Sequence, residues 1–215
     1  MSKIVEFINS KTTGGHYGFR NEGTKNVFTN KMTEAKMVKL QSDDVVADIG
    51  AYVGEYSLYA HKNGAGRIMA FEPTPDTFEI LKRNAEGNFE CYNKAVVGTD
   101  DDFINLYISR GIGVTNSIAK SKNKADCISI PAIKYEDAVK DATVVKIDVE
   151  GAEYSYNIFQ PHIRAYILEF HPIVDMDYKK SASLIMEELK DNGYKTLCEP
   201  GFKNGWDLHG AWIKD

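Results

Sequence analysis

The chain has 215 residues, of which 43% are hydrophobic and 27% charged, and its formal net charge is −5. One domain of this size buries enough apolar surface for its own core, and the acidic balance argues against a nucleic-acid partner. No apolar run approaches the ~20 residues of a membrane span, and the first residues lack a signal-peptide core. Three widely spaced cysteines exclude a complete disulfide framework and predict reduced, mostly buried thiols in a cytoplasmic protein.

Apolar periodicity and turn residues predict an N-terminal arm over 1–32 and a single domain over 33–215. The elements expected in the first half are, in chain order, a helix over 34–40, a strand over 45–49, a helix from about 54 to 63, a strand over 67–72, a helix that begins at 74–76 and a strand over about 89–97. Strands that alternate with helices predict a parallel sheet covered by helices on both faces.

The pattern changes after residue 98. The elements expected there are an alternating strand over 103–108 that pairs with 127–133, a short helix over 136–139, buried strands over 144–150 and 166–172, a helix over 181–192 and a hairpin formed by 194–199 and 209–214. The segment 109–126 is rich in Gly, Ser, Asn and Lys. This composition predicts a lid that folds over a substrate.

The turn after the first strand and the tip of the second strand predict a cofactor site. Glu72 stands 22 positions after Gly50 (72 − 50), which is about the length of a crossover helix. A carboxylate at such a strand tip accepts two hydrogen bonds from a ribose diol, so the cofactor contains adenosine. The turn Gly50-Ala51-Tyr52-Val53-Gly54 lacks the middle glycine that a pyrophosphate needs, and Asp48 suits a cation. These features favour S-adenosylmethionine over a nicotinamide cofactor.

Three further residues are candidates for the same site. Ala51 belongs to the same turn as Gly50. Asp48 and Gly50 are expected to border the methionine half of the cofactor, with helix capping as the alternative for Asp48. Ser57 can approach the methionine carboxylate or ammonium, with a surface role as the alternative. Ala95 can line the adenine, with core packing as the alternative.

Acids and a histidine follow the buried strands of the second half. Asp148 and Glu150 stand two positions apart, so alternation predicts that they face the same side and hold the ammonium, orient a substrate or act as a base. His171 is the first candidate for the base, because a neutral imidazole accepts protons near pH 7; a structural histidine is the alternative. Hard oxygen ligands also suit a divalent cation, which is possible but not favoured. His209 is expected to be a surface or packing residue.

Five blocks of the chain resemble the FkbM-type family of S-adenosylmethionine-dependent methyltransferases. These blocks are DVVADIGAYVGEYS (44–57), IMAFEPTPDTFEILKRN (68–84), NKAVVG (93–98), VVKIDVEGAE (144–153) and YILEFHP (166–172). The most specific block is KIDVEGAE, where Asp148, Glu150, Gly151 and Glu153 match. The resemblance implies the class I methyltransferase fold, an α/β Rossmann-like fold with a mostly parallel seven-stranded sheet whose last strand is antiparallel. Tyr52 departs from the family, which usually has a small amide residue there.

The resemblance also implies methyl transfer to hydroxyl oxygens, often of sugars or sugar-bearing natural products. The expected protein is therefore an O-methyltransferase whose partner is a small-molecule or glycan acceptor. Two alternatives from other classes are a methyltransferase-like binding module without catalysis and a nicotinamide-dependent oxidoreductase. The sequence leaves the acceptor and the oligomeric state open.

Overall fold

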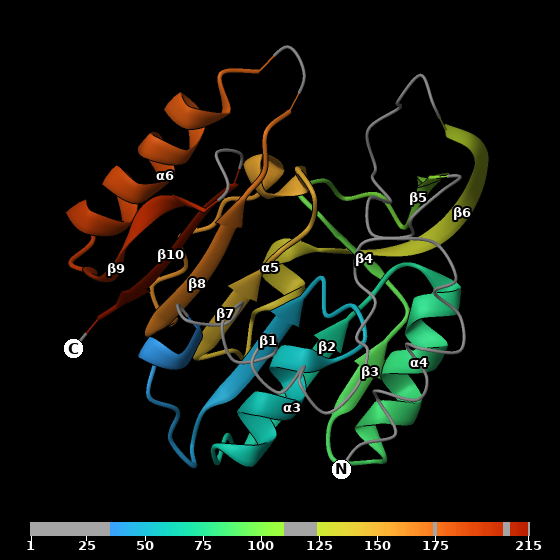
Figure 1. The fold of residues 1–215 in the computed structure, drawn as a ribbon, viewed down its shortest axis with the longest axis horizontal. Helices are drawn as coiled ribbons and strands as arrows, with labels where there is room; N and C mark the ends of the chain where they lie inside the picture. The colour runs from blue at the N-terminus through green and yellow to red at the C-terminus, as the bar shows by residue number, and fades with distance from the viewer. Residues whose placement is uncertain (1–34, 110–123, 174–175, 204–206, 215) are drawn as a thin grey trace.

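The computed structural model describes residues 35–109, 124–173, 176–203 and 207–214. A seven-stranded sheet with the order β3-β2-β1-β7-β8-β10-β9 forms its centre (Figure 1). The strands are β1 (Val45–Ile49), β2 (Arg67–Phe71), β3 (Glu90–Tyr92), β7 (Val144–Ile147), β8 (Ala165–Phe170), β9 (Lys195–Lys203) and β10 (Asp207–Ile213). The first five are mutually parallel, whereas β10 is antiparallel to both of its neighbours. The expected mostly parallel seven-stranded sheet is confirmed.

Helices cover both faces of this sheet. They are α3 (Glu55–Lys62), α4 (Pro75–Ala85), α5 (Tyr135–Ala138) and α6 (Tyr178–Asp191), with short 3-10 helices η2 (Ala35–Met37) and η3 (Ala152–Ser155). Alternate strand residues belong to two separate cores. Ala47 and Ile49 of β1 pack in the core that includes α5 and α6, and Val46 packs in the core that includes α3 and α4. Burial on both faces explains why the central strands are apolar throughout.

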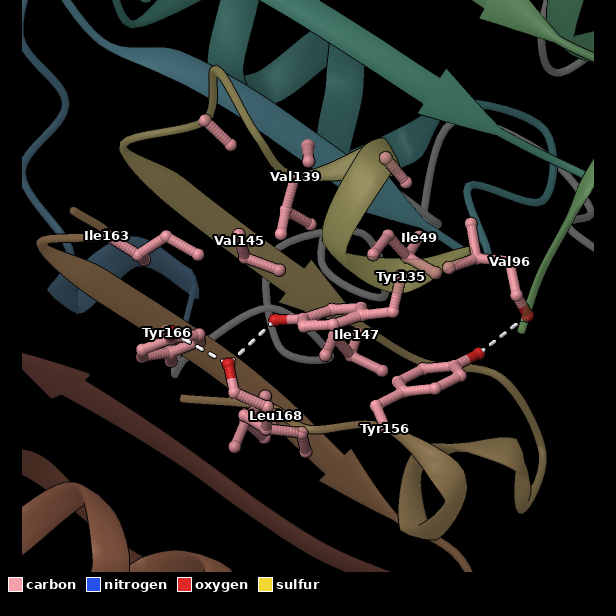
Figure 2. Packing of buried hydrophobic residues seen from close by; sticks show 14 of the residues in the cluster. Ile49, Val96, Tyr135, Val139, Val145, Ile147, Tyr156, Ile163, Tyr166 and Leu168 are labelled. Carbon is pink, nitrogen blue, oxygen red and sulfur yellow. Dashed lines mark hydrogen bonds between the residues drawn. The ribbon is translucent and has the colours of Figure 1, made fainter. Parts of the chain in front are cut away.

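Tyrosines whose hydroxyl groups are all satisfied form part of the first core (Figure 2). The rings of Tyr135 and Tyr156 stack with centroids 5.0 Å apart. Tyr135 and Tyr166 each donate to the carbonyl of Ile158, and Tyr156 donates to the carbonyl of Val96, all at 2.9 Å. The last bond joins the segment after η3 to the strand that contains Val96.

A second, three-stranded sheet has the order β4-β6-β5, with β4 (Ala95–Val97), β5 (Phe103–Ser109) and β6 (Lys124–Lys134). The expected antiparallel pairing of β5 with β6 is confirmed. The single strand expected over 89–97 is wrong, because β3 and β4 belong to different sheets. Between them, the Asn93 side chain donates to the carbonyls of Glu72 and Pro73, at 2.9 and 3.0 Å, and anchors the chain where it leaves the main sheet.

Several local expectations also differ from the structure. The helix expected over 34–40 is only the 3-10 turn η2, although Val38 and Leu40 after it are buried. The strand expected over 144–150 ends at Ile147. The thiols are free, but Cys127 is exposed and the other two are half-buried, so the expected burial is wrong. Cys91 and Cys198 belong to β3 and β9, the two edge strands of the main sheet.

Other expectations fall largely on parts of the chain that the structure does not describe. They are the N-terminal arm and nearly all of the lid segment 109–126. In the described ranges, no helix is both long enough and apolar enough to cross a bilayer.

Candidate active site

The carboxyl ends of β1, β7 and β8 bring three predicted residues together. The ammonium of Lys146 lies 3.5 Å from Asp48 Oδ1 and 3.3 Å from Asp148 Oδ2. His171 Nε2 lies 3.6 Å from Asp148 Oδ1. In a parallel sheet these ends share one edge, which is where ligands of α/β proteins bind. Asp48, Asp148 and His171 therefore belong to one cluster.

Asp48 is fully buried, and one of its oxygens is held by a hydrogen bond. Ser57, in the first turn of α3, donates from Oγ to Asp48 Oδ2 at 2.7 Å. The other oxygen, Oδ1, accepts no hydrogen bond within the described residues, and Lys146 is its nearby positive charge. Ser57 is itself fully buried, so the structure assigns its hydroxyl to positioning Asp48. The surface alternative for Ser57 is therefore wrong, whereas its contact with the cofactor stays a prediction.

Glu72 follows β2 and is anchored by backbone amides. The amide of Thr74 donates to Oε1 at 2.8 Å, and the amide of Tyr52 donates to Oε2 at 3.1 Å. Tyr52 has a φ of 52°, in the left-handed region. Burial raises the pKa of Glu72 to about 7, and these amides only partly oppose the increase. The Thr74 side chain also hydrogen-bonds to this carboxylate, and a ribose diol would use the acceptor capacity that remains.

Packing within the protein itself requires a glycine at position 50. Its φ is 77°, and a Cβ there would lie 1.8 Å from the carbonyl oxygen of Asp148. The amide of Asp148 donates to the carbonyl of Ile49, which continues the β1–β7 ladder past the strand ends. The packing of β1 against the chain after β7 therefore requires a glycine here, and the expected position of Gly50 beside the methionine half of the cofactor stays a prediction.

We expect Gly50→Ala to abolish folding, because the clash is with backbone and cannot be relieved by a side-chain rotation. Gly64→Ala is the matched control: Gly64 has a φ of +89°, but a Cβ there meets nothing within 4 Å. It should cost only about 1–2 kcal/mol of left-handed strain. Thermal unfolding of both variants checks this prediction. Equal and small losses of stability in the two variants would contradict it.

Ala51 and Ala95 are both packed inside the protein. Their exposed fractions are 4% and 2%. The Ala51 amide donates to the carbonyl of Phe71 at 2.9 Å, and Ala95 pairs with Ala132 of β6. Core packing, the alternative weighed for Ala95, accounts for both side chains, and their expected contacts with the cofactor stay predictions.

A turn, not strand alternation, places Asp148 and Glu150. Since β7 ends at Ile147 and Glu150 has a φ of 55°, the prediction that both residues alternate along a strand is wrong. The turn nevertheless directs both carboxylates toward His171. Glu150 Oε1 lies 4.0 Å from His171 Nε2, and Asp148 Oδ1 lies 3.6 Å from it.

His171 is buried and contacts a buried glutamate. Its backbone amide donates to Glu153 Oε1 at 2.6 Å, and its Nδ1 lies 3.3 Å from the same oxygen. Burial by itself lowers the pKa of His171, but the hydrogen bond to Glu153 and the charges of Glu153, Asp148 and Glu150 outweigh it and raise the pKa to about 10. When no cation lies beside it, the imidazole is therefore protonated at neutral pH, which differs from the neutral proton acceptor expected from the sequence.

Sequence reasoning missed Lys146. It stands in the otherwise apolar strand Val144–Ile147, and its ammonium also donates to the carbonyl of Gly50 at 3.3 Å. Burial opposes its charge, but Asp148 and Asp48 hold the pKa of Lys146 above its usual range. In return, burial opposes the ionisation of Asp148, but Lys146 and His171 hold the pKa of that carboxyl below its usual range. A lone lysine inside a buried strand was the available signal.

His209 also belongs to this edge of the sheet. Because β10 runs beside β8, His209 is opposite Glu169, and its Nε2 lies 3.3 Å from Glu169 Oε1. Glu169 Oε1 is 3.6 Å from His171 Nε2 as well. The assignment of His209 to surface or packing is thus corrected, and no local pattern in the sequence could have indicated its position.

A family model described as "Methyltransferase FkbM domain" matches residues 48–196, which is more than half of the chain. The chain belongs to this family. The chain is 39% identical over 62 residues to the 31-O-demethyl-FK506 methyltransferase FkbM of Streptomyces tacrolimicus, covering 28% of this chain and 24% of the relative. It is 28% identical over 145 residues to the methyltransferase sdnD of Sordaria araneosa, covering 59% and 51%. The matches thus span about a quarter and a half of these relatives.

A solved structure supports the fold independently. The precorrin-6Y C5,15-methyltransferase of Geobacter metallireducens GS-15 superposes with a TM-score of 0.50, over 100% of both chains and at 14% identity. Similarity at this level of identity shows the shared class I methyltransferase fold and nothing about the substrate.

Proposed function

We propose that this chain is an S-adenosylmethionine-dependent O-methyltransferase that acts on a hydroxyl of a sugar or glycan intermediate. The observation that carries the proposal is the set of carboxylates at one edge of the sheet. Glu72 stands there with its oxygens fixed by backbone amides, and Asp48 and Asp148 stand at the neighbouring strands. Such an edge favours a ligand with a sulfonium and an ammonium over one with phosphates.

The reaction needs alignment and removal of one proton. The bond from the acceptor oxygen to the methyl carbon forms as the bond from sulfur to that carbon breaks, so the sulfonium becomes a neutral thioether. The hydroxyl proton passes to a base. Asp148 and Glu150 are candidates for that base, whereas His171 must first lose the proton that its acidic neighbours stabilise.

Membership of the FkbM family supports methyl transfer, and one relative is named for an O-demethyl substrate, which agrees with an oxygen acceptor. The sugar or glycan acceptor, the cytoplasmic location and the absence of a nucleic-acid partner are part of the proposal. They rest on the composition and charge of the chain and on its resemblance to the family.

The proposal is tested by mass spectrometry of the glycan pool of host cells that express the wild-type chain or its Glu72→Ala variant. We expect the mass of one glycan species to increase by one methyl group only in the cells that express the wild-type chain. Binding of S-adenosylhomocysteine without any methylated product would instead favour a binding module. Hydride transfer without sulfonium binding would favour an oxidoreductase.

A further inference from the structure

We propose that Asp148, Glu150 and His171 form a binding site for one divalent cation. Each offers one ligand atom, and these atoms all lie within 4.8 Å of one another. The site's suggested role in methyl transfer rests on the proposed function, but its occupancy by a cation does not.

The distances fit an ion better than they fit direct hydrogen bonds. His171 Nε2 is 3.6 Å from Asp148 Oδ1 and 4.0 Å from Glu150 Oε1, beyond normal hydrogen-bond length. Two ligands of an octahedral ion with bonds of about 2.1 Å lie about 3.0–4.2 Å apart. Both carboxylates are about one third exposed, at 33% and 34%, so they can make the small adjustment that closes the site.

Glu153 provides a second and independent indication. Histidines that bind metals usually share their other ring nitrogen with a carboxylate, which fixes the ring and its tautomer. Here Nδ1 of His171 lies 3.3 Å from Glu153 Oε1, and the glutamate is only 1% exposed. Glu153 is itself held by the amides of Gly151 and His171. This arrangement leaves Nε2 as the ring atom that faces Asp148 and Glu150.

The mixture of ligands indicates the class of cation. One imidazole nitrogen with two carboxylates suits Mn²⁺ or a similar first-row ion better than Ca²⁺, whose ligands are oxygens. Three protein ligands leave positions for water and for an oxygen of the acceptor. A cation bound there would lower the pKa of a coordinated hydroxyl, whose proton leaves to water before the oxygen takes the methyl group from sulfur.

Titration of the ligand-free full-length chain with Mn²⁺, followed by the EPR signal of free Mn²⁺, tests the site. We expect one bound ion per chain and at least about tenfold weaker binding by Glu150→Gln. Glu187→Gln is the matched control, because it removes one exposed carboxylate of α6 and should bind as the wild type does. Equal binding by all three proteins, or no stoichiometric binding by the wild type, would overturn the proposal.

A second variant and a second ligand keep the result unambiguous. His171→Gln should also weaken Mn²⁺ binding at least about tenfold. Should this variant fail to fold, the result for Glu150, whose side chain is 34% exposed, decides the question alone. Calorimetry with S-adenosylhomocysteine separates the two proposals. If the chain binds S-adenosylhomocysteine but no Mn²⁺, only the cation site is overturned. If it binds Mn²⁺ but no S-adenosylhomocysteine, the result counts against the cofactor assignment.

Discussion

Replacing Glu72 by alanine is expected to lower the affinity for S-adenosylhomocysteine at least tenfold. The carboxylate is fixed between the amides of Tyr52 and Thr74 at the tip of β2, in position to accept both hydroxyls of a ribose. Each charge-assisted hydrogen bond contributes about 1.5–3 kcal/mol. Calorimetric titration measures the loss, and Glu79→Ala, which removes an exposed glutamate of the following helix α4, should bind as the wild type does.

The raised pKa of the same carboxylate should make ligand binding depend on pH. The pKa of Glu72 is raised to about 7 in the folded chain from an ordinary value of 4.5. Its contribution to stability is therefore complete below about pH 4.5 and is lost as the pH rises to 7. Ligand affinity follows the opposite course, because the ionised carboxylate is the stronger acceptor, so it should increase between pH 6 and pH 8. A folded Glu72→Gln variant with an unchanged pH slope would exclude the ribose role.

Lys146→Met is expected to destabilise the fold by about 3–5 kcal/mol at neutral pH. The ammonium lies 3.5 Å from Asp48 and 3.3 Å from Asp148, and removing it leaves the fully buried carboxylate of Asp48 without its nearby positive charge. Lys82→Met, at an exposed position of α4, is the control and should change stability by less than about 0.5 kcal/mol. Denaturant unfolding measures both values.

The effect of Lys146→Met should also depend on pH. In the wild type the pKa of Asp148 is lowered, so its contribution to stability is present above about pH 4 and is lost as the pH falls. Without the ammonium the pKa of Asp148 should rise, and a raised carboxyl pKa makes the folded state less stable as the pH increases. The stability curves of variant and wild type should therefore separate from pH 4 upward. Equal deficits at pH 4.5 and pH 7.5 would show that lost packing, and not charge, causes the effect.

The strands of the main sheet could be predicted from the sequence more easily than the way in which they join. Strands such as Val45–Ile49 were predicted correctly because burial on both faces produces an apolar run that any local window reveals. Asn93 shows the limit of this signal. Only two residues, Asn93 and Lys94, separate β3 from β4, but the Asn93 side chain bonds to the carbonyl of Glu72 after β2 and the two strands join different sheets.

By itself the sequence determined the alternation of strands and helices, the carboxylate at the tip of β2 and the presence of acids after β7, since these depend on neighbours along the chain. Only the tertiary structure decided that Gly50 faces the backbone of Asp148, that Ser57 binds Asp48, and that His209 joins Glu169 through the antiparallel β10. The charge of His171 was decided in the same way. Each of these outcomes depends on which distant segments become neighbours, and an electrostatic environment is the sum over those neighbours, whatever their separation in the sequence.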